Sequence, residues 1–518
     1  MTTTPKINYP RLKYCRINLV PKNTVEEASK LVADGCIDQD AVKSLFTRGS
    51  VGINPNLSNF GRATLANGFL QKRLTGCRNP VRPAGSEIRE IIEGSKFLLT
   101  QFDLKQWSND WELKYKSTAK PFVKSDWRRH DWLLFAERCG RVETMLLKGR
   151  EAALALEMIS RLDGRSSIVS LKRDYRKQSD LFERLFKFFH RSRLLVSGVN
   201  NQKRKLTGVK FLSHSTLEFN SKSASLLIDP CYLVVNGSKP DSVAEHRLDD
   251  VVADLNQHDA IFISHNHWDH CDFSTLIRIN REIPFFVPRL KRESPFNPSI
   301  KNFLTSLGFK NVKEVSWWNP VKIDDITVTP CPFFGEWFGP DSQFDAFTYF
   351  IELNGTTFFG AVDSDCDQVG NMDGVYKEMR RRLPPIDVLF FGSSAQRHVA
   401  PMRCGAPWNY SNTYEKYADR MRYHADRHRV ESWCRTVKPK FIVPYAEFIF
   451  ENRRPRRPLK LSNLSDMDAH FKQYWSEQPK GLQNEFTRWS KSLERLKKNV
   501  RSIGIQLIMM GPQESLVV

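Results

Sequence analysis

The ten residues from Ile261 to His270 constrain this chain more than any other segment. Residues 261–263 are all apolar, which is typical of a buried strand, and they lead directly into a polar loop, residues 264–270. That loop holds three histidines and one aspartate within six residues, although the 518-residue chain has only 12 histidines. A histidine-rich surface loop is the simpler alternative. Imidazole and carboxylate ligands suit zinc, iron or manganese, so the segment predicts a metal site.

The spacing within this loop favours two ions over one. His265 and His267 alternate along the chain and are expected to bind one ion. Asp269 and His270 lie further around the turn and are expected to bind the second. The sequence therefore predicts a dinuclear centre.

Length and composition place the chain among globular proteins. At 518 residues it is expected to contain two domains, or one enlarged catalytic domain with an appendage. Its 40% hydrophobic and 26% charged content is ordinary. The start lacks the apolar core of a secretory signal, and no run approaches the roughly 18 apolar residues of a membrane span, so we expect a cytoplasmic protein without a span. The ten cysteines form no Cys-x-x-Cys pair, which argues against structural zinc and disulfides.

The net charge of +21 is unevenly distributed. Residues 1–210 hold about 40 basic and about 21 acidic side chains, so this part alone carries roughly +19. Such a surface could attract an acidic protein, nucleic acid or a membrane surface, or could serve only solubility. The region around the predicted metal site is not the basic part.

The pattern along the chain indicates two regions. Residues 1–206 are expected to form a mainly helical, basic N-terminal domain, with helical spacing over 125–162 and 170–195. Residues 200–205 are polar and form the expected linker. Residues 207–518 alternate short strands with helices, which predicts a mixed α/β domain. Its expected strands are 208–212, 224–228, 326–329, 347–353, 356–359, 388–391, 441–443 and, as the last strand, 505–509. Its expected helices lie near 273–281, 370–382, 411–436 and 465–500.

The second region resembles the metallo-β-lactamase superfamily, whose members fold as an αββα sandwich. The resemblance depends on the loop of His265, His267, Asp269 and His270, which is highly specific, and on weaker matches around it. These are His214 after a strand, residues 227–230 ending in Asp229-Pro230, and Asp363 after a Phe-Phe-Gly strand end. The resemblance implies that Asp363 bridges the two metals. A ligating imidazole usually donates its other N–H to a carboxylate or carbonyl, and Asp229 at a strand end is the natural candidate for this second role. Asp272 and His214 are weaker candidates for that second role, and Asp365 and Asp367 are expected to be solvated loop acids.

One departure from the hydrolytic members of the superfamily bears on the metal. Those hydrolases carry a Pro-x-x-His-Trp segment whose histidine completes a three-histidine zinc site, whereas residues 332–337 of this chain read Pro-Phe-Phe-Gly-Glu-Trp. With Glu336 in that position, the first metal would have two histidines and one carboxylate, the set typical of non-haem iron oxygenases. The alternative is that Glu336 is a solvated loop acid. Iron is therefore the expected metal and zinc the alternative.

This segment makes the chain similar to one branch of the superfamily, the diiron β-hydroxylases related to that of chloramphenicol biosynthesis. Those enzymes have an N-terminal domain of about this size and hydroxylate an amino acid tethered to a carrier protein. The resemblance implies a small-molecule substrate, an acidic carrier protein as a possible partner and an external electron donor. A basic N-terminal domain would suit an acidic carrier.

A second departure affects the other metal. The relatives carry a further carboxylate near it, but residues 392–398 of this chain read Gly-Ser-Ser-Ala-Gln-Arg-His, and serine cannot replace a carboxylate. His398 from the same loop, or Glu447 after the strand at 441–443, could supply the last ligand. Both alternatives remain open.

Three functions are compatible with these observations. The first is an O2-dependent diiron monooxygenase acting as a hydroxylase. The second is a dizinc hydrolase of the same fold that cleaves a phosphodiester or lactone. The third is a non-catalytic nucleic-acid-binding protein with a structural metal, which is the least expected because no RNA-recognition signature or zinc-finger spacing is present.

Overall fold

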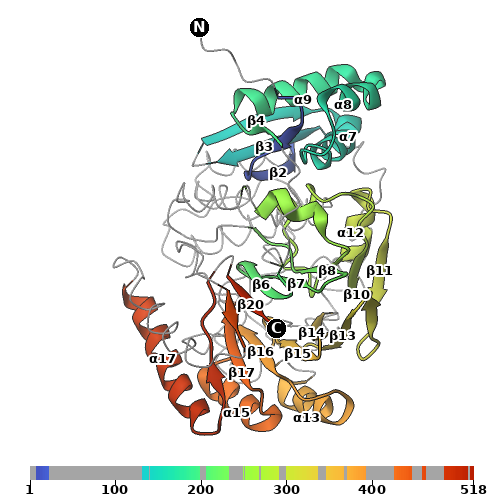
Figure 1. Ribbon diagram of the computed structural model, residues 1–518. Helices are drawn as coiled ribbons and strands as arrows, with labels where there is room; N and C mark the ends of the chain where they lie inside the picture. Colours follow the sequence, from blue (N-terminus) through green and yellow to red (C-terminus); the bar gives the residue numbers. More distant parts are fainter. Residues whose placement is uncertain are drawn as a thin grey trace, which may run out of the picture.

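A computed structural model gives the structure of this protein. It describes residues 7–22, 131–138, 141–198, 206–232, 249, 251–267, 270–290, 299–335, 346–366, 370–392, 425–445, 458–461, 483–511 and 514–518. Within these residues, two large β-sheets stack face to face in the centre and lower part of Figure 1, and a smaller α/β unit lies above them.

The first large sheet has eight strands. In spatial order they are β11 (Val312–Val315), β10 (Phe285–Pro288), β9 (Ala260–Phe262), β8 (Ser225–Ile228), β7 (Thr216–Asn220), β6 (Gly208–Ser213), β20 (Ser515–Val517) and β18 (Leu459–Lys460). Strands β8, β9, β10 and β11 run parallel to one another, so their carboxyl ends meet at one edge. The loop of histidines follows β9 at that edge.

The second sheet has seven strands. In spatial order they are β12 (Val321–Ile323), β13 (Ile326–Pro332), β14 (Phe347–Leu353), β15 (Thr356–Gly360), β16 (Val388–Gly392), β17 (Phe441–Tyr445) and β19 (Gln506–Leu507). Strands β15, β16 and β17 are parallel, so the segments that follow them leave the sheet at the same edge. Asp363 follows the first of these three strands.

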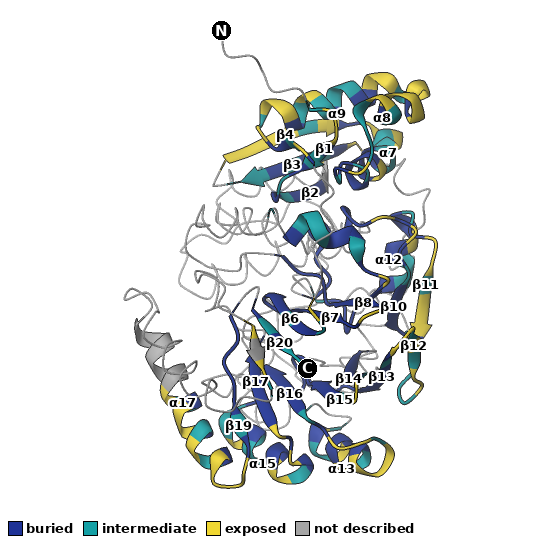
Figure 2. Cartoon of the chain, viewed as in Figure 1, coloured by how far each residue is buried: buried dark blue, intermediate teal, exposed yellow. Residues whose placement is uncertain are grey.

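Alternating side chains divide the sandwich into three apolar layers. Between the sheets, Phe219 of β7 meets Phe358 of β15 edge to face, with ring centroids 5.4 Å apart. The opposite face of the first sheet packs under α11 (Phe273–Leu276) and α12 (Ile300–Ser306). The opposite face of the second sheet packs under α13 (Met372–Arg382), α15 (Arg427–Val437) and α17 (Gln483–Arg501). Figure 2 shows these strands as mostly buried, which confirms the predicted αββα sandwich.

The N-terminal region is a mixed α/β unit in its described part. Strands β2 (Arg16–Pro21), β3 (Trp132–Arg138) and β4 (Arg141–Leu147) form an antiparallel sheet. Helices α7 (Gly149–Ser160), α8 (Ile168–Asp174) and α9 (Ser179–Arg191) accompany it, and β1 (Pro10–Leu12) pairs with β5 (Leu195–Ser197). The prediction of helix is confirmed for 149–160 and for most of 170–191, but it is wrong for 132–147. There, alternate burial along β3 shows the period of a strand, which overrides the helical spacing read from the sequence.

The N-terminal unit packs directly on the layer of helices above the first sheet. Its strands, its helices and α11 share one continuous apolar core. The backbone N–H of Ile17 donates to Ser274 Oγ at 2.8 Å, and Arg278 Nη2 donates to the carbonyl of Cys15 at 2.7 Å. Arg138 and Asp249 form an ion pair at 2.8 Å across the same junction. The N-terminal region thus contacts the helix that immediately follows the histidine loop.

Several sequence predictions fall outside the described residues. The linker at 200–205 is one, and the domain boundary between 206 and 207 stays a prediction. The segment 505–509 contains β19, but β20 follows it, so it is not the last strand.

Among the described helices, none combines the length and apolar character that crossing a membrane requires.

Candidate metal centre

The candidate metal centre is built at the carboxyl ends of strands from both sheets. Asp229 follows β8 and His265 follows β9, and these two strands are parallel neighbours in the first sheet. Asp363 follows β15 of the second sheet. The sandwich therefore brings together side chains that are far apart in the sequence.

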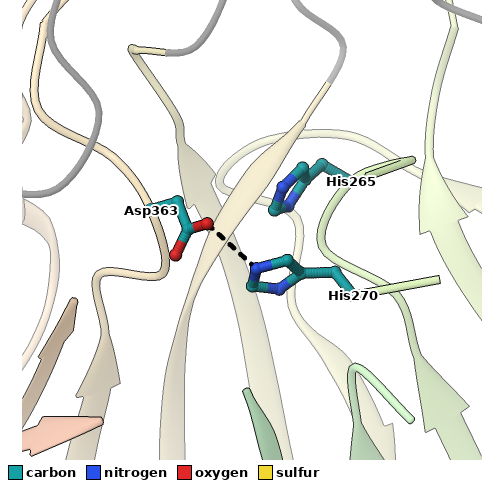
Figure 3. Close-up of side chains that lie close together, drawn as sticks. All are labelled: His265, His270 and Asp363. Atoms are coloured by element: carbon teal, nitrogen blue, oxygen red, sulfur yellow. Dashed lines mark hydrogen bonds and ion pairs between the residues drawn. The ribbon is translucent and has the colours of Figure 1, made fainter. Parts of the chain in front are cut away.

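Three of the predicted ligands form one buried cluster. His265, His270 and Asp363 each offer a ligand atom, and these atoms all lie within 4.8 Å of one another (Figure 3). Nε2 of His270 is 3.1 Å from Oδ2 of Asp363. Two donors bound to one ion at roughly 2.0–2.2 Å would be separated by about this much. Two imidazoles and a carboxylate in a buried site fit a zinc or iron ion.

Asp229 organises both histidines of this cluster. Its Oδ1 accepts from the backbone N–H of Ser264 at 2.6 Å, and its Oδ2 accepts from Ser264 Oγ at 2.6 Å. The same Oδ2 lies 2.9 Å from Nδ1 of His270, and Ser264 Oγ lies 2.9 Å from Nδ1 of His265. A carboxylate that faces Nδ1, directly or through a hydroxyl, keeps the proton there and leaves Nε2 for a metal. Asp229 thus has the contact predicted for it.

Two carboxylates raise the pKa of His270. Complete burial by itself lowers the pKa of this imidazole, but the charges of Asp363 and Asp229 outweigh it, and the pKa is raised well above its usual value. The two acids therefore favour the protonated form of this ring. A metal ion and a proton compete for the same nitrogen, Nε2.

The backbone around the cluster is strained. Asp229 has φ of 47° and His214 has φ of 35°, and Val362, directly before Asp363, has φ of 53°. Positive φ is uncommon for residues other than glycine and is unfavourable for a β-branched residue such as valine. Such strain persists only where the surrounding structure enforces it, and it is concentrated at functional sites.

The remaining described candidates have other positions. His267 is half-buried, and its ring centroid lies 4.7 Å from that of His265, although it is not part of the three-residue cluster. The buried ring of His214 lies 6.2 Å from that of His270. Asp272 caps α11 by accepting from the backbone N–H groups of Ser274 and Thr275, and burial raises its pKa to about 6.

The structure corrects the interpretation of Asp365 as a solvated loop acid. Its side chain is fully buried and forms an ion pair of 2.7 Å with Arg429. Arg429 lies on α15, 64 residues further along the chain, so no local sequence pattern indicated the pair.

Four predicted ligands lie outside the described residues: Asp269, Glu336, His398 and Glu447. Their roles stay predictions, as does that of Asp367. The described chain before Glu336 reaches the cluster, because the ring of Phe333 lies 5.4 Å from that of His265. Strands β16 and β17, which precede the segments with His398 and Glu447, end at the sheet edge where Asp363 lies.

Sequence reasoning missed Ser264, which joins Asp229 to His265. The only available signal was its place directly before the first histidine, and serine is common at strand ends. Its function in the site depends on Asp229, which lies 35 residues earlier.

Comparison with known proteins agrees with this geometry. Residues 225–445 match the model of the beta-lactamase superfamily domain. The chain is 26% identical over 215 residues to the 4-amino-L-phenylalanyl-[CmlP-peptidyl-carrier-protein] 3-hydroxylase of Streptomyces venezuelae. That match covers 41% of this chain and only 37% of the curated relative.

Solved structures share the fold over almost the whole chain. The crystal structure of CmlA, a diiron β-hydroxylase from Streptomyces venezuelae, superimposes with a TM-score of 0.57 at 13% identity and covers 99% of this chain and 100% of that one. A mutant of the CmlA β-hydroxylase gives the same TM-score at 14% identity and covers 98% of this chain and 100% of that one. At such identities the likeness establishes the fold.

Proposed function

We propose that this chain, which carries a domain of the β-lactamase superfamily over residues 225–445, is an O2-dependent dinuclear-iron hydroxylase. The observation that supports hydroxylation is the similarity to a curated 3-hydroxylase over 215 residues. The buried cluster of His265, His270 and Asp363 supports metal dependence.

The proposed ligand set extends this cluster. His265, His267 and Glu336 would bind the first ion, Asp269 and His270 the second, and Asp363 would bridge them. His398 or Glu447 would complete the second ion. Two histidines with one carboxylate are the ligands that non-haem iron prefers, which is why iron is proposed over zinc.

Bound iron would supply O2 activation, with electrons from an external donor, so that a C–H bond of the substrate becomes C–OH. The chain's own contribution is to hold the ligands in one protonation state. Asp229 keeps a proton on Nδ1 of His270, and through Ser264 it orients His265. His265, His270 and Asp363 are all buried, so solvent is excluded from these side chains.

The proposed substrate is an amino acid carried by an acidic carrier protein. The name of the curated relative contains a peptidyl-carrier-protein-bound amino acid, which supports this class. The net charge of +21, most of it in the first 210 residues, would favour association with an acidic carrier.

A dizinc hydrolase is the second candidate. Two imidazoles and a carboxylate, the ligands of the described cluster, suit zinc as well as iron. In that case the same residues would serve hydrolysis of a phosphodiester or lactone.

Metal analysis of the aerobically purified protein separates the two candidates. The proposal expects about two irons per chain and near-ultraviolet absorption from oxygen ligands on iron. About two zincs per chain together with turnover of a generic phosphodiester would contradict it and support the hydrolase.

A further inference from the structure

Asp365 is a buried carboxylate two residues beyond Asp363. Its Oδ1 accepts from Nε of Arg429 at 2.7 Å, while Nη1 of the same guanidinium donates to Asp373 Oδ2 at 2.6 Å. Asp365 is fully buried and Arg429 is half-buried. A buried carboxylate needs such a partner, because an unpaired charge in the interior is strongly destabilising.

The backbone of Asp365 connects two segments near the metal cluster. Its N–H donates to the carbonyl of Phe334 at 2.8 Å, and its own carbonyl accepts from the N–H of Met372, the first residue of α13, at 2.8 Å. The turn that carries Asp363 is therefore attached both to the segment after β13 and to α13. Asp365 is the common point of these contacts.

The segment after β13 is tightly packed at the same place. A Cβ on Gly370 would lie 2.4 Å from the ring of Phe334, so this ring lies directly on the glycine backbone. The ring of Trp317 also packs edge to face against the ring of Phe334, with ring centroids 6.0 Å apart. The neighbouring Phe333 contacts His265. A shift of Asp365 would therefore displace both the Asp363 turn and the residue that packs on His265.

We propose that Arg429 is a positioning residue for the metal centre. By binding Asp365 and Asp373 together, it fixes the position of the Asp363 turn relative to the Phe333–Phe334 segment. This inference rests on the proposed function, since it presumes that the cluster binds metal. Arg429 itself contacts no residue of the cluster, so it acts through Asp365.

The arginine side chain is required by this geometry. Its planar guanidinium donates to two carboxylates from two different nitrogens, Nε and Nη1. The compact ammonium of a lysine is a point charge and cannot reproduce both directions at once. Replacing arginine by lysine therefore keeps the positive charge and removes the geometry, which separates positioning from simple charge balance.

The test compares Arg429→Lys with Arg427→Lys. Arg427 lies on the same helix and pairs with Glu431 at 3.2 Å, so it is a matched control outside the loop contacts. Affinity for Zn²⁺ is measured by chelator competition, and the visible spectrum after loading with Co²⁺ reports coordination geometry. We expect Arg429→Lys to weaken Zn²⁺ binding by about 10- to 100-fold, the usual cost of losing an outer-shell partner, and to alter the Co²⁺ spectrum. Arg427→Lys should change neither.

If Arg429→Lys does not fold, a double variant that makes both members of the Asp365–Arg429 pair neutral still tests the inference. The double variant Asp365→Asn with Arg429→Gln removes both charges of the buried pair and leaves only the half-exposed Asp373 without its arginine partner. We expect it to fold and to show the same loss of Zn²⁺ affinity. Wild-type Zn²⁺ affinity and an unchanged Co²⁺ spectrum in a folded Arg429 variant would overturn the inference alone. Failure of the wild-type protein itself to bind Zn²⁺, Co²⁺ or Fe²⁺ would overturn the proposed function and the inference with it.

Discussion

Oδ2 of Asp229 lies 2.9 Å from Nδ1 of His270, although the two residues are 41 positions apart in the sequence. Both side chains are fully buried, and their contact joins the end of β8 to the loop after β9. Because the opposite nitrogen of His270 faces Asp363, the imidazole links a carboxylate of the first sheet to one of the second. The geometry of the cluster therefore depends on how the two sheets are stacked.

Replacing Asp229 by asparagine should weaken metal binding. Asparagine tolerates the positive φ at this position. Its side chain, however, has only one acceptor oxygen, whereas both oxygens of the Asp229 carboxylate have partners in Ser264 and His270. We expect a loss of about 10- to 100-fold in Zn²⁺ affinity, measured by chelator competition. Asp259→Asn, an exposed aspartate at the opposite end of β8 and β9, is the control, and equal affinities in the two variants would contradict this prediction.

The contact between the N-terminal unit and α11 should contribute to global stability. Arg278 is buried and donates to the carbonyls of Cys15 at 2.7 Å, Lys13 at 3.2 Å and Ser274 at 3.1 Å. Arg278→Met leaves these carbonyls without that donor, and we expect the free energy of unfolding to fall by about 2–4 kcal/mol in urea denaturation. The exposed Arg380→Met should change it by less than about 0.5 kcal/mol. A loss no larger than that of the control would argue against a structural role of this junction.

Gly360 at the end of β15 should not tolerate a side chain. An added Cβ would lie 2.1 Å from Cζ of Tyr349, whose ring is buried between the sheets. Gly360→Ala should therefore destabilise the protein by about 1–3 kcal/mol or more through overpacking. Gly374→Ala is the matched control: its Cβ would meet only the Asn371 side chain, at 3.9 Å, within α13, where alanine is favoured over glycine by about 1 kcal/mol. Urea titrations give the free energy of unfolding of both variants. A Gly360→Ala protein as stable as Gly374→Ala would contradict the prediction.

The strands of the sandwich were largely predictable from the sequence. The segment 347–353 has the same bounds in the structure, and 388–391 differs from β16 by one residue, because short apolar runs between turn residues are typical of buried strands. The region 132–147 was misassigned, since pairing of β3 with β2 and β4 decides its conformation and lies outside any local pattern.

The candidate site was predictable where its residues are adjacent in the sequence. His265 and His270 follow one strand, so their proximity could be expected from spacing alone. Asp363 comes from the other sheet, and only the resemblance to a known family indicated it. Asp365 and Ser264 could not be assigned, because the partners that define them, Arg429 and Asp229, come from other elements.

The sequence-based role of Glu336 predicts metal selectivity. If this side chain is the carboxylate of the first ion, Glu336→His creates a three-histidine set, which suits zinc. We expect the ratio of bound Zn²⁺ to Fe²⁺, measured anaerobically with both ions at equal concentration, to rise relative to the wild type. Glu352→His on β14 is the control for introducing a histidine elsewhere. An unchanged ratio would remove the main argument for iron over zinc.

Removing the carboxylate of Asp363 should abolish binding of both ions. As a bridging ligand it would contribute to each, and its Oδ2 faces His270 Nε2 at 3.1 Å, so its loss also removes an attraction that orients that ring. Elemental analysis of Asp363→Ala should find less than about 0.2 metal per chain where the wild type holds about two. Bound Zn²⁺ is expected to stabilise the wild type by about 2.7 kcal/mol at 100 times the dissociation constant, seen as a higher melting temperature. The variant should lose this increase. Asp180→Ala, at an exposed position of α9, should retain both properties. One ion retained in Asp363→Ala would show that this carboxylate serves a single metal, and two would show that it is not a ligand.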